Sequence, residues 1–348
     1  MYRTARMLFY AVVMLVPSGL GVCGESLAEI GLADAAKPSS SWRWKQDDGV
    51  VGLLDGDCTL WQFNFDWKNS KAYFHPIALT SGPVLTADRP ADHLWHHGMW
   101  FSWKYINHVN YWEENRDTGQ SEGRTTWSNV RIDLRDDFSA RIKMDLAYVD
   151  PSGVTVMTEK RTIDITCPDD EGMYSFDWEC DFTAQDDSLN LGRTPTLDEP
   201  DGKAWGGYAG LSVRFAVGME SQQLRTGTDV AHFQKGRYRG KSFALDYSGV
   251  IDEKSVGVAV LNCYQNLTHP TSWYADASAT MSYLSPAVLY EGPLQLSAGD
   301  TLKTRYRVMI HSGIWESDRL HQEYRTYTQE YGGSVQSQPQ LSATGDNE

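Results

Sequence analysis

The alternation of polar and apolar residues is the feature that most constrains the fold of this chain. Successive side chains of a β-strand point to opposite faces of a sheet, so a period of two predicts half-buried strands. The pattern runs through residues 128–134, 140–148, 154–166, 173–183, 211–217, 242–247, 256–262 and 295–308. Helical periodicity is limited to residues 317–329. The sequence therefore predicts an all-β fold, a large antiparallel β-sandwich of long sheets stacked face to face, with a short C-terminal helix.

The beginning of the chain has the character of a targeting segment. Arg3 and Arg6 precede an apolar run over residues 7–16, and small residues follow this run, which is the order found in secretory signal peptides. We expect residues 1–28 to be a signal peptide; the sequence before Cys23 also resembles a lipoprotein signal. The predicted location is therefore secreted or periplasmic.

The remaining chain is expected to form one large domain. Residues 29–40 are expected to be a linker, residues 41–331 a single β-sandwich domain and residues 332–348 a disordered tail rich in Ser, Gln, Gly and Pro. The formal net charge of −15 argues against nucleic acid and anionic membranes as partners. No later apolar run approaches the ~20 residues that a membrane helix needs. Thirteen Trp and eighteen Tyr residues suit a protein that holds carbohydrate. The oligomeric state stays open.

Four cysteines lie beyond the predicted signal peptide: Cys58, Cys167, Cys180 and Cys263. An extracytoplasmic location permits disulfides. Cys167 and Cys180 fall on neighbouring predicted strands, so they are the expected pair, and none of the four has the spacing of a zinc motif.

Residues 91–112 are the strongest candidate for a functional site. They contain four histidines and four tryptophans, and aromatic faces beside titratable groups are what a protein needs to hold a polar ring and do acid–base work on it. We expect His93 and His97 to be catalytic. If this segment is a strand, residues 93, 95 and 97 share one face and His96 points away. The expected substrate-binding residues of the segment and its continuation are Trp95, Trp103, Trp112 and Glu113.

A second candidate is the long loop predicted over residues 185–210. Loops of this length in a compact domain are usually functional or disordered, and its glycines allow the backbone to approach a ligand closely. We expect Tyr208 to be catalytic, and Trp205 and Arg214 to bind substrate. The alternative is a turn between sheets with buried aromatic residues.

A third candidate combines residues 262–274 with residues 289–293. His269 lies between a threonine and a proline at a strand end, and Glu291 lies between an apolar run and Gly-Pro. A carboxylate held among aromatic rings has its pKa raised towards a useful acid–base range. We expect His269 and Glu291 to be catalytic and Trp273 to bind substrate, whereas a solvated turn glutamate is the alternative for Glu291.

Several motifs resemble a known family. They are Lys71-Ala-Tyr-Phe-His75-Pro76, Asp92-His-Leu-Trp-His-His97-Gly98-Met-Trp-Phe, Trp205-Gly-Gly-Tyr-Ala-Gly-Leu-Ser-Val-Arg214 and His269-Pro-Thr-Ser-Trp273. Together they resemble a family of secreted bacterial proteins that carries the name of the PmoA subunit of particulate methane monooxygenase. That subunit is an integral membrane protein, whereas this sequence has no membrane helix. The resemblance implies carbohydrate metabolism, because the family tends to occur beside sugar dehydrogenases and sugar-degrading proteins.

The predicted architecture is also similar to galactose mutarotase and the related sugar lyases and hydrolases. That similarity implies a histidine pair and a carboxylate that flank a sugar ring, which His93 or His97, His269 and Glu291 could supply. It is a likeness of architecture, and fold does not fix function.

Three functions are compatible with these residues. The first is an enzyme that cleaves or remodels glycosidic bonds of a carbohydrate or glycoside by His, Glu and Tyr acid–base chemistry, without a cofactor or a metal. Hydrolysis and elimination both remain open, because the sequence gives no distance between carboxylates. The second is a non-catalytic carbohydrate-binding sandwich. The third is a metal-dependent oxidoreductase in which His93 and His97 would bind the metal.

Overall fold

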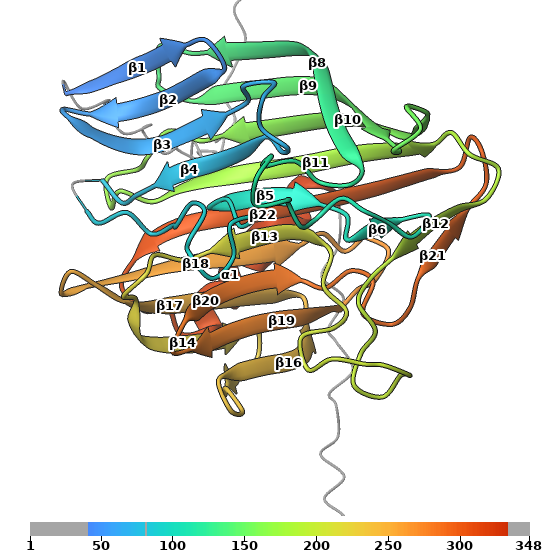
Figure 1. Cartoon of the computed structure of the whole chain (residues 1–348). Coiled ribbons are helices and arrows are strands. Elements are labelled where there is room, and N and C mark those ends of the chain that lie inside the picture. The colour runs from blue at the N-terminus through green and yellow to red at the C-terminus, as the bar shows by residue number, and fades with distance from the viewer. Residues whose placement is uncertain (1–40, 81, 333–348) are drawn as a thin grey trace, which may run out of the picture. The chain divides into compact units, whose positions relative to one another are not determined.

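Two nine-stranded sheets dominate the structure, a computed structural model that describes residues 41–80 and 82–332 (Figure 1). In spatial order the first sheet consists of β1 (Trp42–Asp47), β2 (Val50–Asp55), β3 (Cys58–Asn64), β4 (Tyr73–Ile77), β5 (Met99–Ser102), β13 (Gly210–Arg214), β20 (Met281–Pro286), β19 (Thr271–Ser278) and β16 (Arg237–Ser242). The second sheet consists of β15 (Val230–Ala231), β14 (Glu220–Thr226), β17 (Ala244–Ile251), β18 (Lys254–Asn262), β22 (Thr301–Ser312), β11 (Tyr174–Ala184), β10 (Thr155–Ile165), β9 (Ala140–Val149) and β8 (Arg124–Leu134). A small sheet consists of β21 (Leu294–Leu296), β12 (Leu189–Gly192), β6 (Tyr105–Ile106) and β7 (Val109–Asn110). Neighbouring strands pair antiparallel, as between β10 and β11 and between β19 and β20.

The core lies between the two large sheets. Phe74 of β4 contacts Phe176 of β11 with ring centroids 4.8 Å apart, and Phe101 of β5 lies 5.4 Å from Phe182 of β11. Strand β9 shows the alternation that the sequence predicts, since its buried and more exposed residues alternate along its whole length. The predicted all-β antiparallel sandwich is therefore confirmed.

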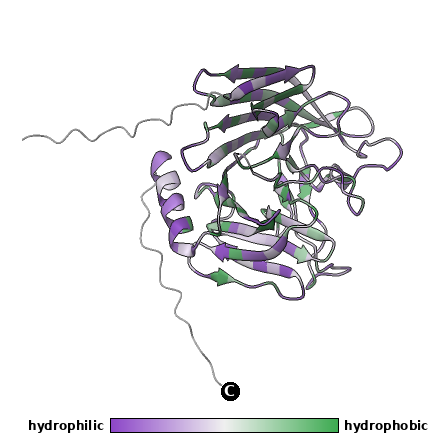
Figure 2. Cartoon of the chain, turned by 90° about the vertical axis from the view of Figure 1, so that its left-hand side faces the viewer, coloured by the Kyte–Doolittle hydropathy of each residue, from purple (hydrophilic) through white to green (hydrophobic). Residues whose placement is uncertain are grey.

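The helix α1 (Ser317–Glu330) packs against the second sheet on the side away from this core. Leu320, Tyr324 and Tyr327 form its buried face, where they join Ala244 and Leu261 of the sheet. Figure 2 shows α1 beside the sheets, with mostly hydrophilic residues on the side of the helix that is in view. The predicted C-terminal helix is confirmed to within one residue at its end.

Three expectations about local structure need correction. The run at residues 295–308 is interrupted, because a turn that ends with the hydrogen bond from the Asp300 amide to the Ser297 carbonyl separates β21 from β22. The loop expected over residues 185–210 contains β12, which pairs with β21 and β6. The predicted strands also did not include β1 to β5, which are five of the nine strands of the first sheet.

The expected disulfide between Cys167 and Cys180 is wrong, and Cys58, Cys167, Cys180 and Cys263 are all free thiols. The hairpin register explains why. Cys180 in β11 lies opposite Arg161 of β10, whereas Cys167 lies beyond the end of β10, six residues further along the chain. At ~3.3 Å per residue the two sulfurs are too far apart to bond.

The signal peptide, the linker and all but the first residue of the tail lie outside the described residues, so these predictions stand as predictions. Within residues 41–80 and 82–332 the one helix is too short and too polar to cross a bilayer.

Candidate functional site

The outer face of the first sheet carries an aromatic and polar surface. Along β19, Trp273 and Ala275 point into the core, so Tyr274 and Asp276 point outward. The same alternation puts Leu284 of β20 inside and Tyr283 outside. This outward face, rather than the core face, meets the loops that carry the histidine segment and the Trp205 loop.

A pocket of about 350 Å³ opens on this face, within the size range of small-molecule sites. The first sheet forms its floor, and three further chain segments, residues 93–96, 112–113 and 205–208, form its walls. Its lining residues are His93, Trp95, His96, Trp112, Glu113, Trp205, Tyr208, Arg237, Tyr274, Asp276, Ser278, Thr280, Met281 and Tyr283. Six of the twelve residues expected from sequence to form a site are among them: His93, Trp95, Trp112, Glu113, Trp205 and Tyr208.

His93 is held by a chain of ionic contacts. Its Nδ1 lies 2.8 Å from Asp92 Oδ2, and both oxygens of Asp92 accept hydrogen bonds from Nη2 of Arg214, at 2.9 and 2.8 Å. Burial alone would raise the pKa of Asp92, but the hydrogen bonds from His93 and Arg214 hold that pKa below its ordinary value. Asp92 is therefore an anion that fixes Nδ1 of His93 and leaves Nε2 for a ligand. Arg214, expected to bind substrate, is buried and does not line the pocket; it holds Asp92, which in turn holds His93.

His96 is the histidine that sequence reasoning placed on the wrong side. Residues 91–97 form turns rather than a strand, with the His96 amide bonded to the His93 carbonyl. The rings of His93 and His96 consequently stack, with centroids 4.5 Å apart, and His96 stacks in turn on Tyr283 at 5.4 Å. Burial, reinforced by the neighbouring His93 and Arg214, lowers the pKa of His96 well below its ordinary value. His96 thus contributes a neutral ring to the pocket.

Glu113 is the carboxylate on the opposite wall. Lys104 and Asn110 both donate to its Oε2, the amide at 2.5 Å, and the Tyr208 hydroxyl donates to Oε1 at 3.3 Å. Burial alone would raise the pKa of Glu113, but the charge of Lys104 and the hydrogen bonds from Lys104 and Asn110 together lower it. Burial and the charge of Glu113 raise the pKa of Tyr208 well above its ordinary value. The pair therefore presents an anion beside a protonated hydroxyl.

Asp276 forms a third polar group at the base of the pocket. It is fully buried, and it accepts hydrogen bonds from the Tyr274 hydroxyl at 2.9 Å and the Ser278 amide at 2.9 Å. Arg237 Nε lies 3.2 Å from Asp276 Oδ2. Each carboxylate of the pocket thus has a cationic partner, so the site is polar without a large net charge.

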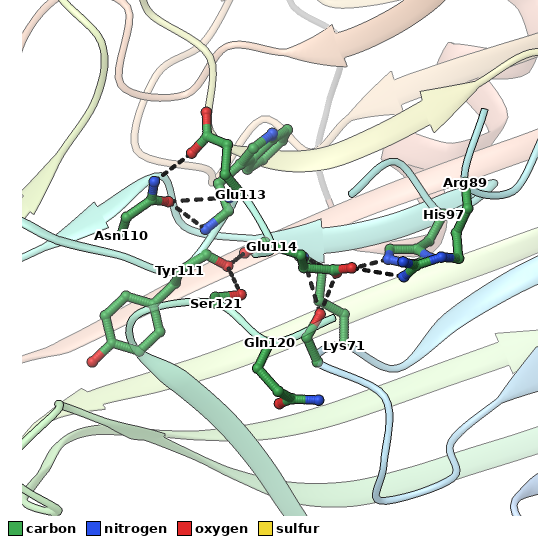
Figure 3. Close-up of polar contacts among 12 residues, drawn as sticks. Lys71, Arg89, His97, Asn110, Tyr111, Glu113, Glu114, Gln120 and Ser121 are labelled. Carbon is green, nitrogen blue, oxygen red and sulfur yellow. Dashed lines mark hydrogen bonds and ion pairs between the residues drawn. The ribbon is translucent and has the colours of Figure 1, made fainter. Parts of the chain in front are cut away.

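His97, expected to be catalytic, does not line the pocket. Its Nδ1 lies 2.8 Å from Asp88 Oδ1 and its Nε2 lies 2.7 Å from Glu114 Oε1. Lys71 Nζ lies 2.6 Å from Glu114 Oε1, and Arg89 Nη1 lies 2.9 Å from Oε2. Burial alone would raise the pKa of Glu114, but the hydrogen bond with His97 and the charge of Lys71 lower it. Figure 3 shows the consecutive carboxylates of Glu113 and Glu114 turned to different sides. We call Lys71, Asp88, Arg89, His97 and Glu114 the His97 ion network.

Gly98 explains the local course of the chain after the histidines. Its φ is +61°, and a Cβ there would lie 2.2 Å from the Phe74 carbonyl oxygen. Only glycine fits this close approach. The turn lets residues 91–97 leave the sheet, so that His93 and His97 face different surroundings.

The remaining expected residues lie elsewhere. Trp103 and Trp273 are in the core between the sheets with no exposed surface. His269 lies near α1, with its Nε2 3.3 Å from the Tyr324 hydroxyl. Glu291 is solvent-exposed and paired with Lys241 at 3.0 Å, and this contact, with the Ser272 hydroxyl, lowers its pKa instead of raising it. Neither His269 nor Glu291 is among the pocket residues.

Sequence reasoning missed His96, Tyr274, Asp276, Tyr283 and Arg237. For Tyr274 and Asp276 a signal existed, because Trp273 and Ala275 mark the apolar face of that strand and leave Tyr274 and Asp276 on the polar face. For Tyr283 and Arg237 no local pattern distinguishes a pocket residue from a core or surface residue.

No group of three or more His, Cys, Asp or Glu side chains suited to a metal ion occurs among the described residues. His93 and His97 bond to different carboxylates, so they do not form the shared site considered from sequence.

Comparison with known structures gives distant likenesses. A "putative aldose 1-epimerase" of Klebsiella pneumoniae aligns with 7% identity over 82% of this chain and 84% of its own, with a TM-score of 0.41. The galactosidase domain of alpha-galactosidase-sucrose kinase AgaSK aligns with 9% identity over 80% of this chain and 41% of its own, with a TM-score of 0.35. A galactose mutarotase related enzyme of Lactobacillus acidophilus has 9% identity, coverages of 79% and 99%, and a TM-score of 0.24. These TM-scores are too low to support an argument, so the assignment of a β-sandwich is based on the strands and sheets of this structure.

No curated protein matches the sequence significantly. The model of DUF6807, a family of unknown function, matches residues 51–325, which include every residue of the pocket. This chain therefore belongs to the DUF6807 family.

Proposed function

We propose that this protein binds a carbohydrate in the pocket and performs acid–base chemistry on it, cleaving or remodelling a glycosidic bond. The observation that carries the proposal is that His93 and Glu113, each oriented by its own charged partner, line one aromatic pocket. The predicted signal peptide would place this chemistry outside the cytoplasm.

The balance of charge favours a polar, uncharged ligand. Glu113 is paired with Lys104, Asp92 with Arg214 and Asp276 with Arg237. Such pairs offer fixed hydrogen-bond donors and acceptors without demanding a charged partner. Aromatic rings bury the apolar faces of a ligand while the polar groups fix its orientation. A sugar ring has both kinds of surface.

Three groups can take part in proton transfer. His93 has Nδ1 fixed by Asp92, which orients the ring and leaves Nε2 to accept or donate a proton. Glu113 is held as an anion, which suits a hydrogen-bond acceptor for a sugar hydroxyl. Tyr208 keeps its proton and can donate a hydrogen bond. We assign His93 the proton transfer, with Glu113 and Tyr208 opposite it.

The test uses the purified protein on a panel of glycosides and free aldoses. Sugar release, absorbance of unsaturated products and the rate of anomer interconversion are measured together, which separates hydrolysis, elimination and isomerisation. His93→Ala and Glu113→Gln are expected to lose at least ~100-fold in rate. The matched controls His269→Ala and Glu291→Gln, outside the pocket, are expected to keep wild-type rates.

Equal rates in all four variants would refute the assigned residues. Sugar binding without turnover across the panel would instead favour a carbohydrate-binding module, whose ligand affinity should depend on Trp95 and Trp112 and survive His93→Ala. A protein that neither binds nor converts any sugar of the panel would contradict the proposal as a whole.

A further inference from the structure

The exposure of the pocket residues increases from the floor to the mouth. His96, Trp112, Asp276 and Tyr283 are buried at the floor, against the first sheet. Trp205 is 46% exposed and stands at the mouth. A ligand that fills the pocket therefore meets buried side chains at the floor and the exposed ring of Trp205 at the mouth.

The backbone around Trp205 is held in place although its ring is exposed. The Gly206 carbonyl accepts a hydrogen bond from Arg239, and the Gly207 amide donates to the Thr194 carbonyl at 2.8 Å. Gly207 has a φ of +85°, and a Cβ there would lie 2.6 Å from the Tyr290 ring. A Cβ at Gly206 would lie 1.9 Å from the Pro195 carbonyl oxygen. These two glycines let the loop pack tightly and fix the position from which Trp205 projects.

A fixed aromatic ring at the mouth is suited to a second sugar ring. An exposed tryptophan alone needs no explanation. Here, however, the ring lines the pocket, and its loop is already ordered, so that stacking against a ligand costs little conformational entropy. Leu197 is 72% exposed on the same loop but is not a pocket residue.

We propose that the pocket receives the terminal residue of a longer carbohydrate and that Trp205 stacks on the next sugar ring. This inference rests on the proposed function. It assigns the protein to ligands with at least two rings, whose terminal residue would lie against the buried floor that the first sheet forms, and to action at that end of the chain.

Binding of sugars of two lengths tests the inference. The probes are methyl glycosides of glucose and galactose in both anomeric forms, each compared by calorimetry with disaccharides that carry the same residue at the non-reducing end. The wild type is expected to bind one disaccharide more tightly than its methyl glycoside. Trp205→Ala is expected to lose about fivefold in disaccharide affinity and to leave the methyl glycoside affinity unchanged. Trp205→Phe should restore most of the loss, and the control Leu197→Ala should bind as the wild type.

The outcomes separate the two proposals. If the methyl glycosides bind and no disaccharide binds more tightly, the outer subsite is refuted while the proposed function survives. An equal loss for both sugar lengths in Trp205→Ala also refutes it, because Trp205 would then act on the first ring. If no sugar binds to the wild type, both proposals fall.

Discussion

His93 and His97 are four residues apart, yet their removal should have opposite consequences. His97 is 4% exposed, and its two ring nitrogens contact Asp88 and Glu114. His93 has a side chain 35% exposed and one ionic contact, with Asp92. We therefore expect His97→Ala to act on stability, and His93→Ala to act on ligand affinity and activity.

The magnitudes follow from the contacts that each substitution removes. His97→Ala removes two hydrogen bonds to charged groups, each worth ~1.5–3 kcal/mol, but Asp88 is partly exposed and Glu114 keeps Lys71 and Arg89. We expect a loss of about 3 kcal/mol in the free energy of unfolding, which in a domain of this size lowers Tm by roughly 5 °C. His93→Ala leaves Asp92 bonded to Arg214, so its cost should stay below ~1 kcal/mol, or roughly 2 °C.

Differential scanning calorimetry of both variants, beside ligand titrations, measures the two effects. The expected pattern is a low Tm for His97→Ala, and a normal Tm with lost activity for His93→Ala. An unchanged Tm in His97→Ala together with lost activity would refute the reasoning, since it would mean that His97 reaches the ligand. An equally large fall of Tm in His93→Ala would show that the contact with Asp92 is structural.

Three further changes have defined outcomes. Arg214→Met removes the cation beside Asp92, so the pKa of Asp92 should rise and the acid limb of the affinity–pH profile should move to higher pH. Hydrogen bonds from Arg193 and from the backbone hold the pKa of Glu199 at about 2, below its ordinary 4.5. Glu199 should therefore stabilise the Trp205 loop fully above pH ~4.5, and this stabilisation should be lost as the pH falls towards 2. Acrylamide quenching of tryptophan fluorescence should detect the loss, and Glu199→Gln should abolish the pH dependence. Gly98→Ala should cost about 3 kcal/mol by thermal unfolding, through strained backbone and a clash, whereas Gly56→Ala, with φ +57° but open space, should cost clearly less.

The fold was predictable because burial on one face leaves a period of two in the sequence. That period is clear in β8 to β11, where one face of each strand meets the core. It is weak in β5, whose four residues are all buried because both of its faces are covered. Strand β5 was missed for this reason, and with it the distinction between Trp100, which faces outward, and Trp103, which is in the core.

The candidate site was only half predictable, because composition locates a segment but not the direction of each side chain. The histidine cluster was identified correctly as a segment, but its turn conformation brings His96 to the pocket and takes His97 away from it. Tyr274 illustrates a different error. Its neighbour Trp273 was chosen on residue type, although a shift of one residue along a strand exchanges the core face for the pocket face.

The His97 ion network assigns a structural role to His97, which lies close to pocket residues in the sequence but does not line the pocket. His97 belongs to the segment that carries His93, and Glu114 follows directly after Glu113. The contact of 2.7 Å between His97 Nε2 and Glu114 Oε1 therefore ties together the two segments that supply the proposed catalytic groups. In each segment one residue, His93 or Glu113, lines the pocket, and a second residue of the same type, His97 or Glu114, holds the segment in place. The contact between His97 and Glu114, which lies outside the pocket, therefore helps to set the distance between His93 and Glu113.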